Sequence, residues 1–338
     1  MTQHTVPPDE AVATYLDSRH DITKSTRSNH RYRLGLFTEW AQDNIDTMSE
    51  LTGLDVQQHV NWRHTDEAPD CAPITHQQHL HTLRVFLRWC ERAELVEQGI
   101  SESVPIPSVS SDERTSDDTV SYDRATAILS HLERYEWASK THIAFGILYH
   151  TGMRRSALHA LDVDDWHPDD QYLSIRNHAE EGTRIKLGAE GERQVAIQND
   201  TLARAIDDWL TDVRPDVTDD HGRAPLIGTQ HGRIHPTSIA KTTYKITRPC
   251  VVTDECPHGR DIDECEATAA KHASKCPSSR GPHALRRAAI SHHLSSDISK
   301  DIVSARMSVS KPVLDEHYDA RDEQQKRENR AKHLDKLD

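Results

Sequence analysis

The stretch from residue 281 to residue 318 carries three side chains that could act together on a phosphodiester. His283 and Arg286 lie three residues apart, so they share one face of a helix whose first turn suits Pro282. An imidazole can move a proton near neutral pH, and a guanidinium can grip two phosphate oxygens. Tyr318 follows further along the chain with a hydroxyl that can serve as a nucleophile. Because these residue types are common, the set needs support from elsewhere in the sequence.

That support comes from the run YHTGMR at residues 149–154. Gly152 permits a sharp bend in the backbone, after which a new helix can present Arg154. The alternative is structural, because Arg154 could simply pair with acidic residues in the run at 162–170. The pattern favours the chemical interpretation when it is taken together with the downstream residues.

Four pieces of the sequence together resemble the catalytic domain of the tyrosine recombinases, the family of phage integrases and Xer-like recombinases. In the order of that family, they are TGMR at 151–154, Lys186, HALR at 283–286 and Tyr318. The resemblance covers residues 121–321. It implies a site-specific recombinase or integrase that cleaves and rejoins DNA strands. It also implies double-stranded DNA as partner, a homo-tetramer on synapsed DNA, and no cofactor for catalysis.

The resemblance gives each of these residues a role. Arg154 and Arg286 would clamp the non-bridging oxygens of the scissile phosphate and stabilise the charge that grows in the transition state. His283 would act as a general base or a hydrogen-bond donor. Lys186, on a hairpin loop, would give a proton to the leaving 5′-oxygen. Tyr318 would attack phosphorus and leave a 3′-phosphotyrosyl bond.

Two positions depart from the family pattern. Ala157 stands where the family has Glu, and Val309 stands where it has His or Trp, nine residues before Tyr318. A valine side chain cannot donate a hydrogen bond to a phosphate. Either Ser308 or Ser310 substitutes, or catalysis is reduced. One alternative function is therefore a catalytically impaired DNA-binding protein of the same fold.

The net charge of the chain needs an explanation if the partner is DNA. Acidic residues outnumber basic ones by 55 to 41 among 338 residues, which gives a formal charge of −14. Such a chain repels polyphosphate as a whole. The acidic excess resembles proteins of salt-accumulating, halophilic archaea, where the Debye length is about 3 Å at molar salt and distant charges are screened. The alternative is an ordinary acidic protein that never meets DNA.

The spacing of apolar residues predicts a mainly α fold with a small β-sheet or hairpin. Residues 1–105 show helical periodicity and resemble the family's helical core-binding domain, which clasps DNA. The polar, turn-prone residues 106–120 predict a linker. We expect residues 121–338 to form an α+β catalytic domain with a cysteine-rich insert at 248–280.

The insert supplies five candidate zinc ligands: Cys250, Cys256, Cys265 and Cys276, with His258 as an alternative ligand. Structural zinc takes four sulfur or nitrogen ligands, and a short segment with few apolar residues gains folding free energy from it. The alternative is a set of free, reduced thiols. If the insert were itself the recognition module, the protein would be a zinc-dependent DNA-binding regulator.

The sequence shows no signal for a membrane or for secretion. No apolar run approaches the roughly 20 residues that a membrane span requires. The opening residues MTQHTVPPDE have neither a basic nor an apolar region of the kind found in signal peptides. We expect a cytoplasmic protein with reduced cysteines.

Overall fold

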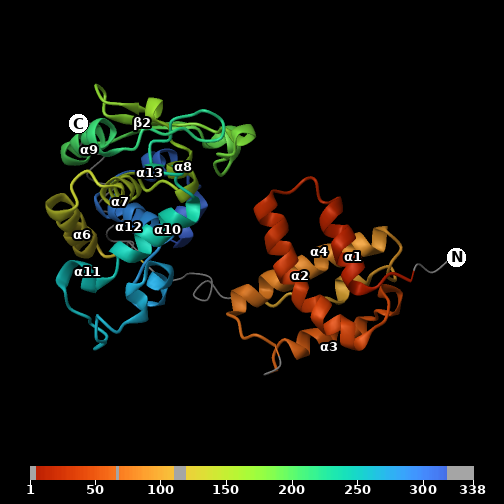
Figure 1. Ribbon diagram of the computed structural model, residues 1–338. Coiled ribbons are helices and arrows are strands. Elements are labelled where there is room, and N and C mark those ends of the chain that lie inside the picture. Colours follow the sequence, from red (N-terminus) through yellow and green to blue (C-terminus); the bar gives the residue numbers. More distant parts are fainter. Residues whose placement is uncertain (1–4, 66–67, 110–118, 318–338) are drawn as a thin grey trace, which may run out of the picture. The chain divides into compact units, whose positions relative to one another are not determined.

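The computed structural model describes residues 5–65, 68–109 and 119–317. The chain divides into two compact units, Met1–Ser116 and Asp117–Asp338. Both are built mainly of helices, and the second also carries a small antiparallel sheet (Figure 1). The predicted fold class, mainly α with a small β-sheet, is confirmed. No helix in the described ranges has the length and apolar character needed to cross a membrane.

The first unit is a helical bundle around an aromatic core. Its helices are α1 (Pro8–Ser18), α2 (Lys24–Asn44), α3 (Gly53–Trp62) and α4 (Pro73–Arg92), with short 3₁₀ turns at Met48–Glu50 and Ile100–Ser103. Thr52 begins α3 in a capping box with Asp55, which satisfies backbone donors at the helix start. The rings of Tyr15, Phe37 and Phe86 are buried and pack against one another. This burial holds α1, α2 and α4 together.

The second unit is organised around one buried helix. Helix α7 (Lys140–Thr151) is apolar nearly all round and contacts α6 (Tyr122–Tyr135), α9 (Asp200–Asp208), α10 (Pro236–Ile246) and α12 (Pro282–Ser295). The shorter helices are α8 (Arg155–Ala160), α11 (Pro249–Thr253), α13 (Lys300–Met307) and α14 (Lys311–His317). A helix that is hydrophobic on every side needs neighbours on every side. The surrounding helices cover α7 on its apolar sides. They also bring the C-terminal end of α7 next to the start of α12.

The small sheet lies beside this helical body (Figure 1). Strands β1 (Trp166–His167), β2 (Tyr172–Ile175) and β3 (Arg193–Ala196) are antiparallel in the order β1-β2-β3. Leu173 faces Val195 in the register, and both side chains are buried. A separate hairpin joins β4 (Gly228–Thr229) to β5 (Gly232–Arg233). The loop between β2 and β3 is the predicted hairpin that carries Lys186.

A buried ion-pair network fixes the β4–β5 hairpin to the end of α8. Arg233 bonds to Asp162 and Asp219 and donates to the carbonyls of His159 and Leu161. The side chains of Arg233, Asp162 and Asp219 are 7%, 14% and 9% exposed. Removing one partner from such a network leaves the others buried without compensation.

Replacing Arg233 with Met is therefore expected to lower the free energy of unfolding by about 3–5 kcal/mol. The measurement is urea denaturation of the full chain. The control is Lys275→Met, which breaks the exposed ion pair between Lys275 and Glu266 and should cost about 1 kcal/mol or less. Equal losses in the two variants would contradict a structural role for the network.

The same network predicts how acid affects stability. Burial alone would raise the pKa of Asp219, but hydrogen bonds from Arg233 and from the backbones of Arg223 and His221 lower that pKa to about 2. The ordinary pKa of an aspartate is about 3.9. The contribution of Asp219 is therefore complete above pH 4 and is lost as the pH falls towards the folded-state pKa.

Candidate active site

Arg154 is placed by the turn that ends α7. The helix ends at Thr151, and Gly152 follows with a left-handed φ of +60°. A Cβ atom on Gly152 would lie 2.7 Å from the sulfur of Met307, so any larger residue would strain the turn and clash as well. Arg154 is the N-cap residue of α8 and is half-buried. The role expected of Gly152 in the sequence is confirmed by this geometry.

Arg286 ties three parts of the second unit together. It lies one turn into α12, whose first residue is Pro282, and the whole residue is 3% exposed. Its Nη1 donates to the carbonyls of Gly152 and Met307, both at 2.7 Å. The guanidinium therefore joins the end of α7, the start of α12 and the end of α13. Arg286 supports the fold at the same point where it could bind a ligand.

The two predicted arginines meet at one oxygen atom. Arg154 donates from Nη1 to the carbonyl of Ser308 at 2.7 Å, and Arg286 reaches the same carbonyl from Nη2 at 3.5 Å. The two guanidiniums come from residues 132 positions apart in the sequence (286 − 154 = 132). A carbonyl oxygen carries partial negative charge, and a phosphate oxygen carries more of it. The structure thus brings together two cations that can bind one phosphate group.

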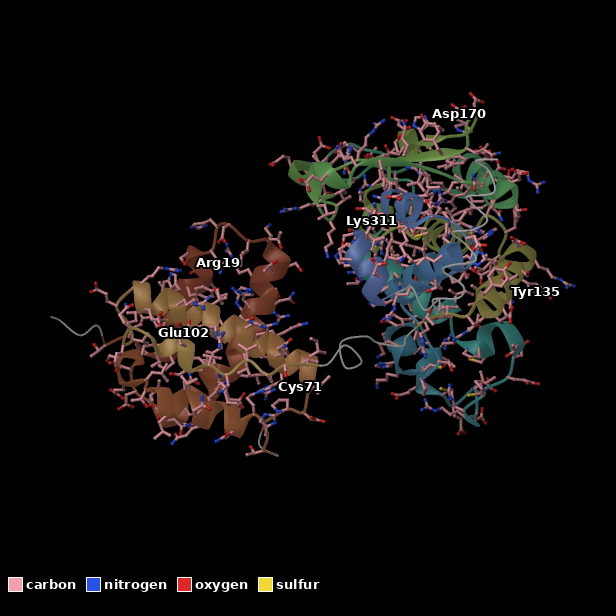
Figure 2. The ribbon with its side chains drawn as sticks, turned by 180° about the vertical axis from the view of Figure 1, so that it is seen from behind. Arg19, Cys71, Glu102, Tyr135, Asp170 and Lys311 are labelled. Atoms are coloured by element: carbon pink, nitrogen blue, oxygen red, sulfur yellow. The ribbon has the colours of Figure 1, made fainter. Side chains whose placement is uncertain are left out.

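The acidic run at 162–170 is engaged elsewhere. Asp162 pairs with Arg223 and Arg233, and Asp165 pairs with Arg176. Asp170, in the turn between β1 and β2, is exposed and points away from the second unit (Figure 2). Asp162 and Asp165 are therefore neutralised by other arginines, and Asp170 is solvated.

His283 lies within the electrostatic influence of the same cations. His283 is exposed, but partial burial of its imidazole lowers its pKa, and the charges of Arg287, Arg286, Arg154 and Lys186 lower it further. The imidazole is therefore held in its neutral form near pH 7, which is the form a general base needs. Lys186 and the two arginines therefore lie close enough to His283 to act on its charge.

Lys186 and Arg154 face the same hollow. Its lining also includes Ala157, Ile185 and Arg193. Lys186 is exposed, whereas the neighbouring Ile185 is 3% exposed and anchors the loop in the core. Arg193 was not among the residues predicted from the sequence. No sequence motif marks Arg193, which lies on β3. Only the folded structure shows that it lies beside Arg154.

Val309, the residue that stands where a hydrogen-bond donor is expected, lies in the core of the second unit. Val309 is 6% exposed and packs in an apolar cluster with Ile290, Leu294 and Met307. Its side chain is part of the core, while the preceding residue, Ser308, offers its carbonyl to both arginines. Ser308 therefore meets the two arginines with a backbone acceptor, and a side-chain donor from Ser308 or Ser310 stays a prediction.

Ser308 holds a backbone conformation that suits glycine, with φ of +51°. Such a conformation costs a non-glycine residue about 1–3 kcal/mol. Ser308→Gly removes this strain from the folded state. Glycine also gains entropy in the unfolded chain, which offsets part of the benefit, so we expect a net rise of about 0.5–1 kcal/mol in the free energy of unfolding. Thermal unfolding measures this. Ser304→Gly, the same change inside α13, should have the opposite sign, and stabilisation by both variants would contradict the explanation.

The cysteine-rich insert keeps its thiols reduced in the structure. Cys276 is buried, and Cys250, Cys256 and Cys265 are half-buried. Burial raises the pKa of the Cys250 thiol, and the nearby Cys276 and Cys256 raise it further. His258 bonds to Ser278 instead. Within the described ranges, no three His, Cys, Asp or Glu side chains are grouped so that they could hold a metal. A zinc site therefore stays a prediction.

Tyr318, the predicted nucleophile, lies outside the described residues. The structure describes the backbone of α14 as far as His317 and the side chains of that helix as far as Asp315. The geometry of the site therefore rests on Arg154, Lys186, His283 and Arg286.

Comparisons with known proteins bear on the fold. Neither a protein-family model nor a curated protein matches the sequence. Among solved structures, the Tn1549 transposon integrase in complex with a circular intermediate DNA is 14% identical with a TM-score of 0.67, over 97% of this chain and 99% of that chain. A lambda integrase dimer bound to a COC′ core site is 12% identical with a TM-score of 0.65, over 95% of this chain and 80% of that chain. The chain therefore has the fold of the tyrosine recombinases and integrases.

Proposed function

We propose that this protein is a site-specific DNA recombinase or integrase that works through a 3′-phosphotyrosyl intermediate. The observation that carries the proposal is the meeting of Arg154 and Arg286 at the Ser308 carbonyl, with His283 and Lys186 close by. Two permanent cations from distant segments, beside a neutral imidazole, suit phosphodiester chemistry. The solved structures of similar fold include integrases bound to DNA, which supports double-stranded DNA as the partner.

In the proposed step, the phenol oxygen of Tyr318 attacks phosphorus and the bond from phosphorus to the 5′-oxygen breaks. The phenol proton passes to His283, and Lys186 gives a proton to the leaving oxygen. Arg154 and Arg286 bind the non-bridging oxygens, where negative charge grows. A 5′-hydroxyl from another strand reverses the step, because the phosphotyrosyl link keeps the energy of the original bond.

The experiment that tests the function begins with the DNA site. Duplexes that the full chain binds are selected from a random pool, in the salt concentration that gives the sharpest selection. The selected site is then made with a nick, so that the fragment carrying the freed 5′-hydroxyl diffuses away after cleavage. A covalent protein–DNA adduct supports the proposal. Tight, specific binding without any adduct would instead favour the catalytically impaired DNA-binding protein, which the buried Val309 suggests.

The rate of adduct formation should depend on pH through His283. The lowered pKa predicts that the rate at limiting DNA is flat from pH 8 down to about 6.5, the ordinary histidine value, and falls only in more acid solution. His283→Gln should be slower by about 10²–10⁴-fold and should lose that acid limb. A rate that already declines between pH 8 and 7 would rule out a neutral His283 as the base.

The proposal extends to the oligomeric state, the salt requirement and the metal content of the protein. A homo-tetramer on synapsed DNA would give one active site to each of four strands, and mass photometry of the DNA complex measures it. A halophilic setting would suit the charge of −14, and activity measured up to molar salt tests it. Metal analysis of the purified chain and of Cys256→Ser decides whether the insert holds zinc. Intact DNA binding without zinc would remove the zinc-dependent regulator.

A further inference from the structure

Arg193 is held by two of its three guanidinium nitrogens. It begins β3, where it pairs with Ile175 of β2. Its Nε donates to the carbonyl of Arg306 at 2.7 Å, and its Nη1 donates to the carbonyl of Gly191 at 2.8 Å. These two bonds fix the plane of the guanidinium. In the described part of the chain, Nη2 makes no hydrogen bond, so one donor nitrogen is left for a ligand.

The side chain lines the hollow in which Arg154 and Lys186 also lie. The free volume of this hollow is about 10 Å³, which is room for about one water-sized group. The rest of its lining is Ser156, Ala157 and Ile185, none of which carries a charge. A single phosphate oxygen has the size and the charge that this hollow accepts.

The charges around Arg193 favour an anion. Burial, together with the nearby charges of Arg154 and Arg306, lowers the pKa of Arg193 to about 10. Arg193 is still charged at neutral pH, so three guanidiniums with like charge lie close together. Their mutual repulsion is relieved when an anion lies between them.

We propose that Arg193 is a third phosphate-binding arginine, which donates from Nη2 to a non-bridging oxygen of the phosphate that Arg154 binds. The inference rests on the proposed recombinase function, because that function puts a phosphodiester in this site. The fixed guanidinium of Arg193 presents its free donor to the phosphate without reorganisation. Arg193 thereby contributes to the ground-state binding of DNA and to the stabilisation of the transition state.

A cycle of protein and DNA changes tests the proposal. Arg193→Met removes the donor, and a methylphosphonate at the scissile position replaces one charged oxygen with a neutral methyl group; both diastereomers are used. On ordinary DNA, Arg193→Met should slow adduct formation by about 10²-fold. On the diastereomer that lacks the bound oxygen, the same substitution should change the rate less than about threefold, because the partner of the lost donor is already gone.

Two controls separate contact from structure. Arg184→Met removes an exposed arginine from the loop that leads into β3 and should change neither rate. Thermal unfolding of Arg193→Met reports whether the loss of its two carbonyl bonds disturbs the fold. If Arg193→Met slows the reaction by the same factor on ordinary DNA and on both methylphosphonates, Arg193 does not touch the phosphate and the inference is overturned.

The DNA affinities of the same protein and DNA variants are also measured, because binding does not require DNA cleavage. If wild type forms no adduct but the affinities of the four combinations are coupled, the proposed function fails and the Arg193 contact stands. If wild type forms the adduct and the effects on rate and affinity are simply additive, the proposed function stands and the Arg193 contact fails. The two ideas are therefore tested separately.

Discussion

Tyr318→Phe is expected to bind the selected DNA site as tightly as wild type and to form no covalent adduct at all. The substitution removes one oxygen atom, which in the proposed reaction is the nucleophile, and leaves the ring in place. The measurement is denaturing gel electrophoresis of the reaction on nicked DNA, with affinity measured in parallel. The loss should be complete, because no other group replaces a missing nucleophile at the same position.

The matched control is Tyr135→Phe. Tyr135 lies on α6 and is 65% exposed, and Figure 2 shows it at the periphery of the second unit. Its hydroxyl should be dispensable, so this variant should form the adduct at the wild-type rate. An adduct of normal yield from Tyr318→Phe would mean that another residue attacks the DNA, and the assignment of the nucleophile would be wrong.

Arg154→Ala is expected to slow adduct formation by about 10²–10³-fold, the usual effect of removing one preorganised donor from a transition state. Arg154 donates to the Ser308 carbonyl in the structure, and in the proposed reaction it donates to a phosphate oxygen. Arg154→Lys keeps the charge but loses the planar pair of donors, so it should recover only part of the rate.

Arg155→Ala is the control for this prediction. Arg155 is the next residue along the chain and the first residue of α8, and its side chain is exposed. It should keep a rate within about threefold of wild type, since surface substitutions away from a site have small effects. If the two variants are equally slow, the reaction depends on the total positive charge of this turn and not on the specific hydrogen bonds that Arg154 donates. If neither is slow, the arginine pair is not the phosphate site.

Much of the fold was predictable because burial imposes periodicity on the sequence. The apolar spacing in residues 1–105 predicts helices, and the aromatic rings of Phe37 and Phe86 are buried as their spacing indicates. The bend at Gly152 was predictable too, because few other residues adopt its φ without strain. The prediction that Arg154 and Arg286 meet depended on the resemblance to a family, since spacing along the chain says nothing about contacts between distant segments.

The rest of the site depended on contacts that residue types do not encode. The Ser308 carbonyl is a backbone group, so no side-chain pattern marks it as the meeting point of two arginines. The place of Arg193 depends on how β3 packs against α13, where the Arg306 carbonyl accepts its hydrogen bond. Val309 looked like a missing hydrogen-bond donor, but its side chain serves an apolar cluster. In the cysteine-rich insert, the irregular spacing of the thiols could not determine which of them come together.

The most direct test of the central claim is to identify the atom through which protein and DNA become linked. The adduct formed by wild type on nicked DNA is digested with protease and nuclease, and the modified peptide is sequenced by mass spectrometry. The account predicts a nucleotide joined through its 3′-phosphate to the side chain of Tyr318. A link to any other residue, a link through a 5′-phosphate, or unmodified peptides from a protein bound at its selected site would contradict it.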